Sequence, residues 1–215
     1  MRAFMRAPLR APLRAPLRVS VRGPRRPALL VWGRWTAGFL AFPIGGLAGR
    51  AAAGPVDDAM SALVGGVVTG AVIGAGQALL SSGRLSPPRW AAATAAGSGL
   101  GLLLGAALVG HRTDLGSLAL MGAVEGVLLG VAQACALPRT ARLPWLWAVA
   151  MPALWAAGWT VTTLAGVGVD ARFTVFGATG ALTFSALSGI LLHRLLPATA
   201  PGRTTGSDAL REVDA

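Results

Sequence analysis

Five polar side chains in this sequence lie within otherwise apolar segments and have the residue types that could bind an ion or a hydrogen-bonding solute. Glu125 is the only acidic residue within such a segment, and it falls close to the middle. Gln77 and Gln133 each stand near the end of a segment, and Ser188 stands at the matching place of another. The best available cation for the Glu125 carboxyl group is Arg34, in the first segment. The candidate residues are therefore Glu125, Gln77, Gln133, Ser188 and Arg34.

The sequence leaves two interpretations of Glu125 open. Placing a carboxylate near the middle of a membrane costs about 2.5–3.5 kcal/mol on insertion scales, so an acid there is expected to be neutral, paired or hydrated. An acid at this depth is a functional-site hypothesis by default, here with Arg34 as its partner. The alternative is a protonated carboxyl group with a structural role, while the Arg34 side chain extends to the membrane surface.

Gln77 and Gln133 hold the same position relative to two runs of small residues. Each follows the first glycine of its run by eleven residues. At about 100° per residue, this spacing places the glutamine and that glycine on nearly the same helix face. The glutamines therefore either form interhelical hydrogen bonds or line a polar cavity that opens toward the cytoplasm.

Small residues recur at every fourth position in three runs, whose starts lie 56 and 55 residues apart. This spacing forms a ridge along one helix face, and in lipid such ridges let helix backbones approach closely. We therefore predict three tandem two-helix repeats with packed small-residue faces. The runs are Gly66, Gly70 and Gly74, then Gly122, Gly126 and Gly130, then Gly177, Ala181 and Ser185, and an intervening segment adds Gly97, Gly101 and Gly105.

Six apolar segments with the length of membrane spans carry these residues. The mean hydropathy of the 215 residues is +0.63, and 13% are charged, against about 25% in ordinary soluble domains. Crossing the hydrocarbon core takes about 20 residues in a helix. We predict an all-α integral membrane protein with a transmembrane domain over 28–196. Its six transmembrane helices are expected at about 29–49, 60–81, 90–110, 116–137, 145–166 and 173–195.

The distribution of charge predicts that both termini are cytoplasmic. The connection after the second segment carries Arg84 and Arg89, and the one after the fourth also has two arginines. The alternate connections hold one arginine each together with aspartates, so the positive-inside rule orients the chain. Asp58, Asp114 and Asp170 in these connections are expected to cap the helices that follow. An interfacial aromatic belt is expected from Trp32, Trp35, Trp90, Trp145 and Trp147.

Residues 1–27 form a basic tail rich in arginine and proline. Eight of the 19 basic residues lie in this tail without any acidic residue, and they supply most of the net charge of +11. Regularly spaced prolines disfavour a helix, so we predict a disordered or polyproline-like tail. It either binds anionic lipid or is low-complexity sequence upstream of the true start. Nucleic-acid binding is disfavoured, because no aromatic platform accompanies the charge. Residues 197–215 are predicted to form a flexible cytoplasmic tail.

No pattern typical of a catalytic or metal-binding site occurs in the sequence. It contains no phosphate-binding glycine loop, no dinucleotide-binding fingerprint and no cluster with metal-ligand spacing. His111 and His193 are expected at opposite membrane surfaces, where they cannot share a metal ion. We therefore predict a protein that is not an enzyme and that needs no cofactor or metal.

The glutamine-bearing runs lead into basic turns that are followed by tryptophan. In one copy Gly126, Gly130 and Gln133 precede Arg142-Leu143-Pro144-Trp145, and in another Gly70, Gly74 and Gln77 precede Arg84-Leu85 and Trp90. These G-x3-G-x2-Q helices resemble a loose group of bacterial multi-spanning membrane proteins. The resemblance covers the second to fifth segments, although an aromatic residue often follows the glutamine in that group, whereas alanine follows it here. It implies a location in the bacterial inner membrane and brings no activity to this chain.

Together these features lead to two main hypotheses and one weaker one. The first is a module for the passage of a small solute or ion, with Glu125, Gln77, Gln133 and Arg34 along the path. The alternative is a structural or accessory membrane subunit whose glycine ridges bind partner helices or a second copy of the chain. Size and span count alone raise a third, the substrate-binding subunit of a vitamin-type importer. A shared water-accessible cavity around Glu125 and the glutamines would favour passage, and separate helix contacts would favour the subunit.

Overall fold

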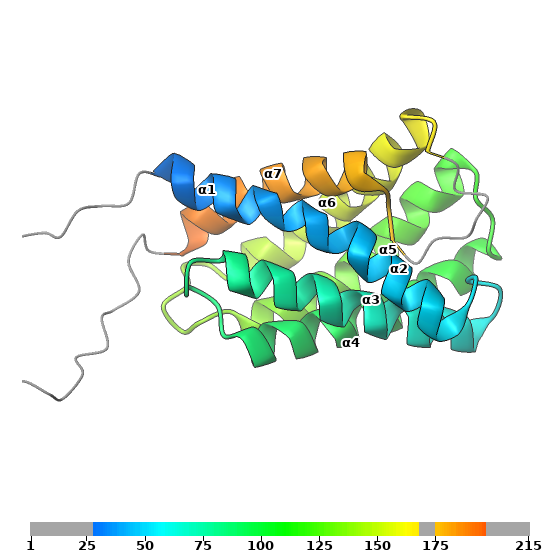
Figure 1. The fold of residues 1–215 in the computed structure, drawn as a ribbon, viewed down its shortest axis with the longest axis horizontal. Coiled ribbons are helices and arrows are strands. Elements are labelled where there is room, and N and C mark those ends of the chain that lie inside the picture. The colour runs from blue at the N-terminus through cyan, green and yellow to red at the C-terminus, as the bar shows by residue number, and fades with distance from the viewer. Residues whose placement is uncertain (1–27, 168–174, 197–215) are drawn as a thin grey trace, which may run out of the picture.

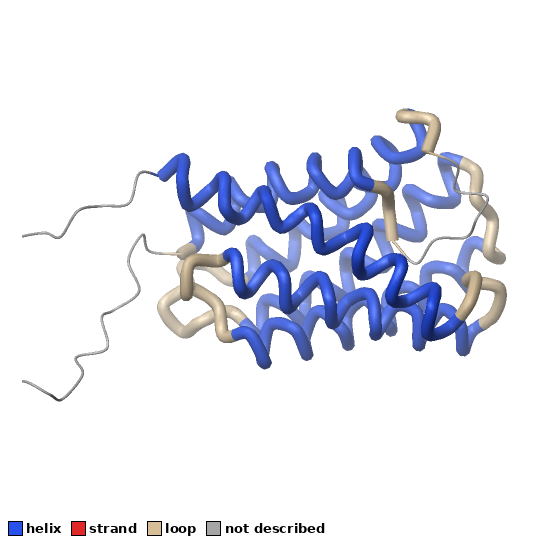
Figure 2. Tube along the Cα trace, viewed as in Figure 1, coloured by secondary structure: helices blue, strands red, loops and turns tan. Residues whose placement is uncertain are grey.

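The computed structural model describes residues 28–167 and 175–196, and every regular element within them is a helix. The tails predicted for 1–27 and 197–215 lie outside the described residues. The elements shown in Figure 1 and Figure 2 are α1 (Ala28–Thr36), the 3-10 helix η1 (Ala37–Leu40), α2 (Ala41–Ala53), α3 (Ala59–Leu80), α4 (Pro87–Val109), α5 (Leu115–Ala136), α6 (Trp145–Leu164) and α7 (Ala178–Leu195).

The helices follow the predicted segments closely in the middle of the chain. α3, α4, α5 and α6 begin and end within three residues of the predicted bounds. The α3, α4 and α5 helices are long and apolar enough to cross a membrane, which marks the chain as a membrane protein. The first predicted segment is helical but is interrupted by η1, and Pro43 lies in the first turn of α2, where a helix tolerates proline.

The helices form a closed ring. Each helix packs against the next one in the chain, and α7 returns to α1 and η1. Figure 1 shows the start of α1, the end of α7 and the loops 81–86 and 137–144 at one end of the bundle. We call this the basic end, and the end with the loops 54–58 and 110–114 the aspartate end. The described arginines at the basic end are Arg34, Arg84, Arg89, Arg139, Arg142 and Arg194, and the described aspartates, all at the aspartate end, are Asp57, Asp58 and Asp114.

Glycine brings successive helices into direct backbone contact. A Cβ atom added at Gly70 of α3 would lie 2.6 Å from a carbonyl oxygen of α4, and one at Gly101 of α4 would lie 2.7 Å from a Cα of α5. At Gly126 of α5 the distance to the α6 backbone would be 2.6 Å. The predicted packing role of the ridges is thus confirmed on three helices. An added Cβ would also lie within 3.0 Å of the adjacent helix at Gly66, Gly74, Gly97, Gly105, Gly122 and Gly130.

The third run departs from this pattern. Gly177 is the N-cap residue of α7, and a Cβ added there would lie 3.3 Å from the Thr162 side chain of α6, so its contact is looser than those of the glycines in the other runs. The close approach is made one turn later, where a Cβ added at Gly180 would overlap the carbonyl oxygen of Gly158 on α6. The reason is that α7 starts at Ala178, five residues later than the predicted segment.

Aspartate side chains cap two helices at the aspartate end, as the sequence predicts. Asp58 accepts a hydrogen bond of 2.7 Å from the backbone N–H of Ser61, and Asp114 accepts one of 3.0 Å from Ser117. These bonds satisfy backbone donors that the first turns of α3 and α5 leave free. The Ser61 N–H lowers the pKa of the Asp58 carboxyl group, because it stabilises the carboxylate. The third predicted cap, Asp170, lies outside the described residues.

Aromatic side chains fill the interior of the ring in its aspartate half. Phe42 of α2, Trp155 of α6, Phe176 just before α7 and Phe184 of α7 are each no more than 1% exposed. Their ring centroids lie 4.8–6.1 Å apart in the contacting pairs. Because α2 and α6 are not neighbours in the ring, their contact must cross its interior.

Glycine at the α5–α6 contact is expected to be essential for stability. Gly126→Ala should lower the free energy of unfolding by about 1–3 kcal/mol, because the added methyl group meets backbone atoms that cannot move aside. Gly33→Ala is the matched control, since no atom lies within 4 Å of its added Cβ and alanine favours a helix. Thermal unfolding in mild detergent measures both variants, and equal stabilities would contradict this account of the ridge.

The Asp58 cap should make stability depend on pH only in the acid range. The lowered pKa of the folded state means that the carboxylate stabilises the fold above the unfolded-state pKa of about 3.9, and that this contribution is lost as the pH falls through the folded-state value. Asp58→Ala should therefore have a lower Tm than the wild type at pH 7, with a difference that narrows below about pH 3.9. Asp58→Asn, which can still cap the helix, should lose less stability at pH 7.

Candidate functional site

Three tryptophans meet inside the ring near the basic end. Trp35 of α1, Trp90 of α4 and Trp147 of α6 are each no more than 1% exposed. Their ring centroids lie 5.7–6.4 Å apart, and every pair is arranged edge to face. These helices alternate around the ring with α3, α5 and α7, so the indoles touch one another across its interior. With the phenylalanine-rich cluster of the aspartate half, they fill the bundle at two levels.

Each of these tryptophans donates a hydrogen bond to one of the polar residues singled out from the sequence. The Nε1–H of Trp90 donates to Gln77 Oε1 on α3 over 3.0 Å, and that of Trp147 donates to Gln133 Oε1 on α5 over 2.9 Å. The third pair closes the ring, because the Trp35 indole donates to Ser188 Oγ on α7 over 3.1 Å.

The interhelical hydrogen bond, one of the two interpretations of these residues, is therefore present at all three positions. Gln77 is 2% exposed, Gln133 is 1% exposed and Ser188 is fully buried. The acceptor atom of each side chain accepts a hydrogen bond from an indole. At this level the interior between the three side chains holds the packed tryptophans.

Gln133 also connects α5 to α4. Its Nε2 donates to Thr94 Oγ1 over 2.9 Å, and the Thr94 hydroxyl donates to the carbonyl oxygen of Trp90 over 2.8 Å. A continuous set of hydrogen bonds therefore runs from Trp147 through Gln133 and Thr94 to the Trp90 backbone. A buried group that loses such a partner costs about 1–3 kcal/mol, so each member of this set holds the others in place.

The aromatic belt predicted from five tryptophans is wrong for three of them. Trp35, Trp90 and Trp147 lie in the interior, whereas Trp145 is 56% exposed on the outer surface. Position near a helix end is common to an interfacial and to an interior tryptophan, so it could not separate the two. The sequence does contain a signal for the interior position of two of them. Gln77 and Gln133 precede Trp90 and Trp147 by 13 and 14 residues, a spacing that brings them side by side on two antiparallel helices joined by a short loop.

Glu125 lies between α4 and α6 and is 1% exposed. On the α4 side it occupies the space that Gly101 leaves, since a Cβ added at Gly101 would lie 2.9 Å from Glu125 Cγ. On the α6 side, the indole N–H groups of Trp155 and Trp159 face its carboxyl group. Neither indole nitrogen nor Glu125 Oε2 reaches a hydrogen bond of good geometry. Glu125 therefore sits in a buried, closely packed site, and its Oε2 atom has unused hydrogen-bonding capacity.

Arg34 does not pair with Glu125, which corrects the pairing proposed from the sequence. Its side chain is exposed on α1 at the basic end, where it borders a cavity of about 410 Å³ together with Leu30, Val31 and Ser82. Arg34 and Trp35 are adjacent, so their side chains point about 100° apart around the helix. Trp35 points into the ring, and Arg34 therefore points out of it. Arg34 therefore belongs to the outer surface and not to the polar interior. In the described residues, no three acidic, histidine or cysteine side chains gather where they could hold a metal ion.

Removing the Gln133 carboxamide is expected to destabilise the bundle even when an apolar side chain of similar size replaces it. Gln133→Leu should lower the free energy of unfolding by about 1–3 kcal/mol, because the Trp147 N–H is left buried without an acceptor. Combining it with Trp147→Phe should recover part of that loss, since the stranded donor is then removed as well. Thermal unfolding of the single and double variants measures this coupling, and strictly additive losses would contradict it.

Comparison with protein-family models, with curated proteins and with solved structures found no significant match for the chain.

Proposed function

We propose that the chain crosses a bacterial inner membrane six times as three tandem two-helix repeats, with both termini cytoplasmic. Contacts that recur three times support the repeats. The three tryptophan pairs are one such set. A second set joins equivalent positions of the two helices in each repeat: the Thr69 hydroxyl donates to the Gly45 carbonyl oxygen, Glu125 packs on Gly101, and Gly180 packs on Gly158. The gathering of described arginines at the basic end supports the orientation.

We propose further that the protein is a structural or accessory membrane subunit and not an enzyme. The observation that carries this proposal is that Gln77, Gln133 and Ser188 are each used to bind a tryptophan that closes the interior. A path for solutes needs polar groups that face water, and these groups face indoles. A bundle tied together in this way is suited to hold its shape and to offer its outer surface to another membrane protein or a second copy.

The surface for such a partner differs from the one that the sequence favours. The glycine ridges of α3, α4 and α5 are covered by neighbouring helices of the same chain. A partner would instead meet the outward faces of the bundle. On α4 this face is a stripe of half-exposed leucines at one-turn spacing, namely Leu100, Leu104 and Leu108.

Native mass spectrometry of the full chain extracted in mild detergent tests this function. The expected result is a defined complex, either a dimer or a stoichiometric assembly with one other membrane protein. Introducing a photo-crosslinking residue at Leu104, which is 51% exposed, should give a crosslink within that complex, and the same residue at the fully buried Leu102 should not. A monomer in every mild detergent, with crosslinks to lipid alone, would overturn the proposal.

One observation favours passage of an ion as a second candidate. Glu125 Oε2 and the indole nitrogens of Trp155 and Trp159 are buried together without hydrogen-bond partners. An opening of the α5–α6 contact would offer these groups to a proton or a small hydrated ion. This candidate requires a second conformation of the bundle, because the present one is packed at two aromatic levels.

Proteoliposomes containing the purified chain test the ion-passage candidate directly. If it holds, Glu125→Gln should lower proton or potassium flux by about tenfold or more while leaving the Tm within a few degrees, because a carboxyl group is replaced by its neutral isostere. Ser98→Ala is the control, since it changes another buried polar group without a partner on the neighbouring helix α4. No flux above empty liposomes, or flux equal in the wild type and Glu125→Gln, would exclude Glu125 as the site.

A further inference from the structure

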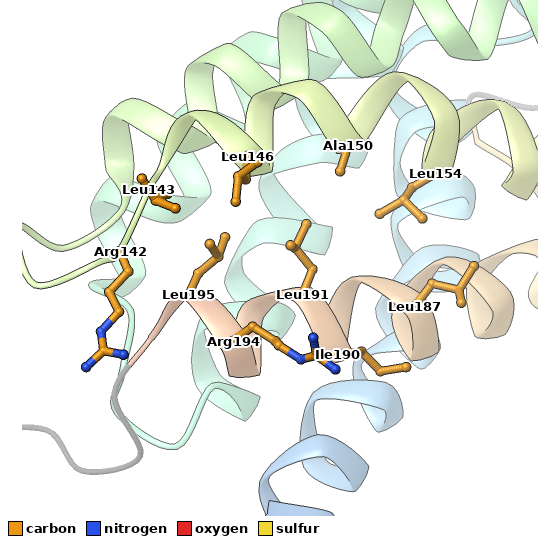
Figure 3. A pocket seen from close by; sticks show the side chains of 10 residues that line it. All are labelled: Arg142, Leu143, Leu146, Ala150, Leu154, Leu187, Ile190, Leu191, Arg194 and Leu195. Atoms are coloured by element: carbon orange, nitrogen blue, oxygen red, sulfur yellow. The ribbon is translucent and has the colours of Figure 1, made fainter.

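An apolar groove with two arginines at its mouth runs along the outer surface between α6 and α7. Its volume is about 640 Å³ (Figure 3). Leu146, Ala150 and Leu154 point into it from α6, and Leu187 and Leu191 from α7. Arg142 and Arg194 lie toward the basic end, and none of the described residues that line the groove carries a carboxylate.

The groove exists because α6 and α7 approach closely at only one place. Toward the aspartate end Gly158 and Gly180 bring the two backbones together. Toward the basic end the facing positions are leucines, which hold the helices apart. At the mouth, the backbone N–H of Arg142 donates to the carbonyl oxygen of Leu195 over 2.8 Å, which fixes the 137–144 loop beside the last turn of α7.

The length of the groove is close to the depth of one leaflet of a bilayer. From Leu146 to Leu154 the wall on α6 rises over eight residues, or about 12 Å at 1.5 Å per residue, and Leu143 in the preceding loop extends it toward the basic end. Half of a hydrocarbon core about 30 Å thick is about 15 Å. The apolar wall therefore approaches the depth of one acyl chain layer, and Arg142 and Arg194 belong to its basic end.

We propose that this groove binds an anionic glycerophospholipid of the leaflet at the basic end. One acyl chain lies along Leu146, Ala150 and Leu191, and the phosphate group accepts hydrogen bonds from the guanidinium groups of Arg142 and Arg194. Figure 3 shows the exposed Arg194 side chain extended along α7 beside Ile190, so it turns toward the basic end when the lipid binds. Within the described residues the mouth carries two cations and no acidic side chain, which favours a headgroup with net negative charge over a zwitterionic one. Basic pockets between membrane helices are suited to such headgroups. This inference does not depend on the proposed subunit role.

Native mass spectrometry of the full chain with added phosphatidylglycerol or phosphatidylcholine tests the proposal. The wild type should retain phosphatidylglycerol in preference to phosphatidylcholine. Arg142→Gln combined with Arg194→Gln should weaken phosphatidylglycerol binding by about tenfold or more. Arg89→Gln combined with Arg139→Gln is the matched control, because it removes the same charge from exposed arginines at the same end but outside the groove.

A third variant tests the apolar wall while both arginines stay in place. Ala150→Trp fills the middle of the groove and should lower phosphatidylglycerol retention at least threefold without lowering the Tm. A phosphatidylglycerol with a photoreactive acyl chain should crosslink to α6 and α7 peptides in the wild type and not in this variant.

Three outcomes would overturn the proposal. They are an equal loss of binding in both arginine pairs, no preference between the two lipids, and crosslinks spread evenly over all helices. A fourth contrary result would come from a photo-crosslinking residue placed at position 150: if it captured a protein segment in place of lipid, the groove would hold a partner helix.

Discussion

The absence of a side chain at glycine is the constraint on which the bundle depends. Lipid is as apolar as leucine, so helices in a membrane gain little by burying apolar side chains against one another, and close packing must supply the attraction. Gly70, Gly101 and Gly126 permit contacts that a single Cβ atom would block. Where glycine is present, successive helices touch along their length. Where leucine replaces it, between α6 and α7 near the basic end, a groove opens.

The second organising interaction is the hydrogen bond between an indole and a polar side chain. A buried tryptophan offers a large apolar surface and one donor that must be satisfied. Gln77, Gln133 and Ser188 satisfy that donor for three tryptophans that meet across the ring. These polar residues, which are of a type suited to line a passage, instead hold tryptophan side chains in the interior of the bundle. Glu125 differs from them, since its Oε2 atom and the two indole nitrogens that it faces have no hydrogen-bond partner among the described residues.

The sequence predicted local features well and spatial relations less well. The bounds of α3 to α6 and the caps at Asp58 and Asp114 follow from apolar length and from residues beside them in the chain, so they could be predicted. The interior position of Trp90 and the separation of Arg34 from Glu125 depend on how each helix is rotated in the ring. A helix that is apolar on all sides carries no polar face to fix that rotation, so the prediction from the sequence placed these residues by their position along the helix.

The helices, the faces on which small residues allow close packing, and the positions at which polar residues recur all follow from the order of residues in the chain. These properties are set by spacing along one helix, and a helix has a fixed geometry. What each face meets follows only from the three-dimensional packing of the helices. This packing joined α7 to α1, so that Ser188 binds Trp35 across more than 150 residues, and it set Glu125 against Gly101 on one side and two indoles on the other. Such contacts depend on the order of helices around the ring and on their rotation, and neither is encoded by the spacing within a single helix.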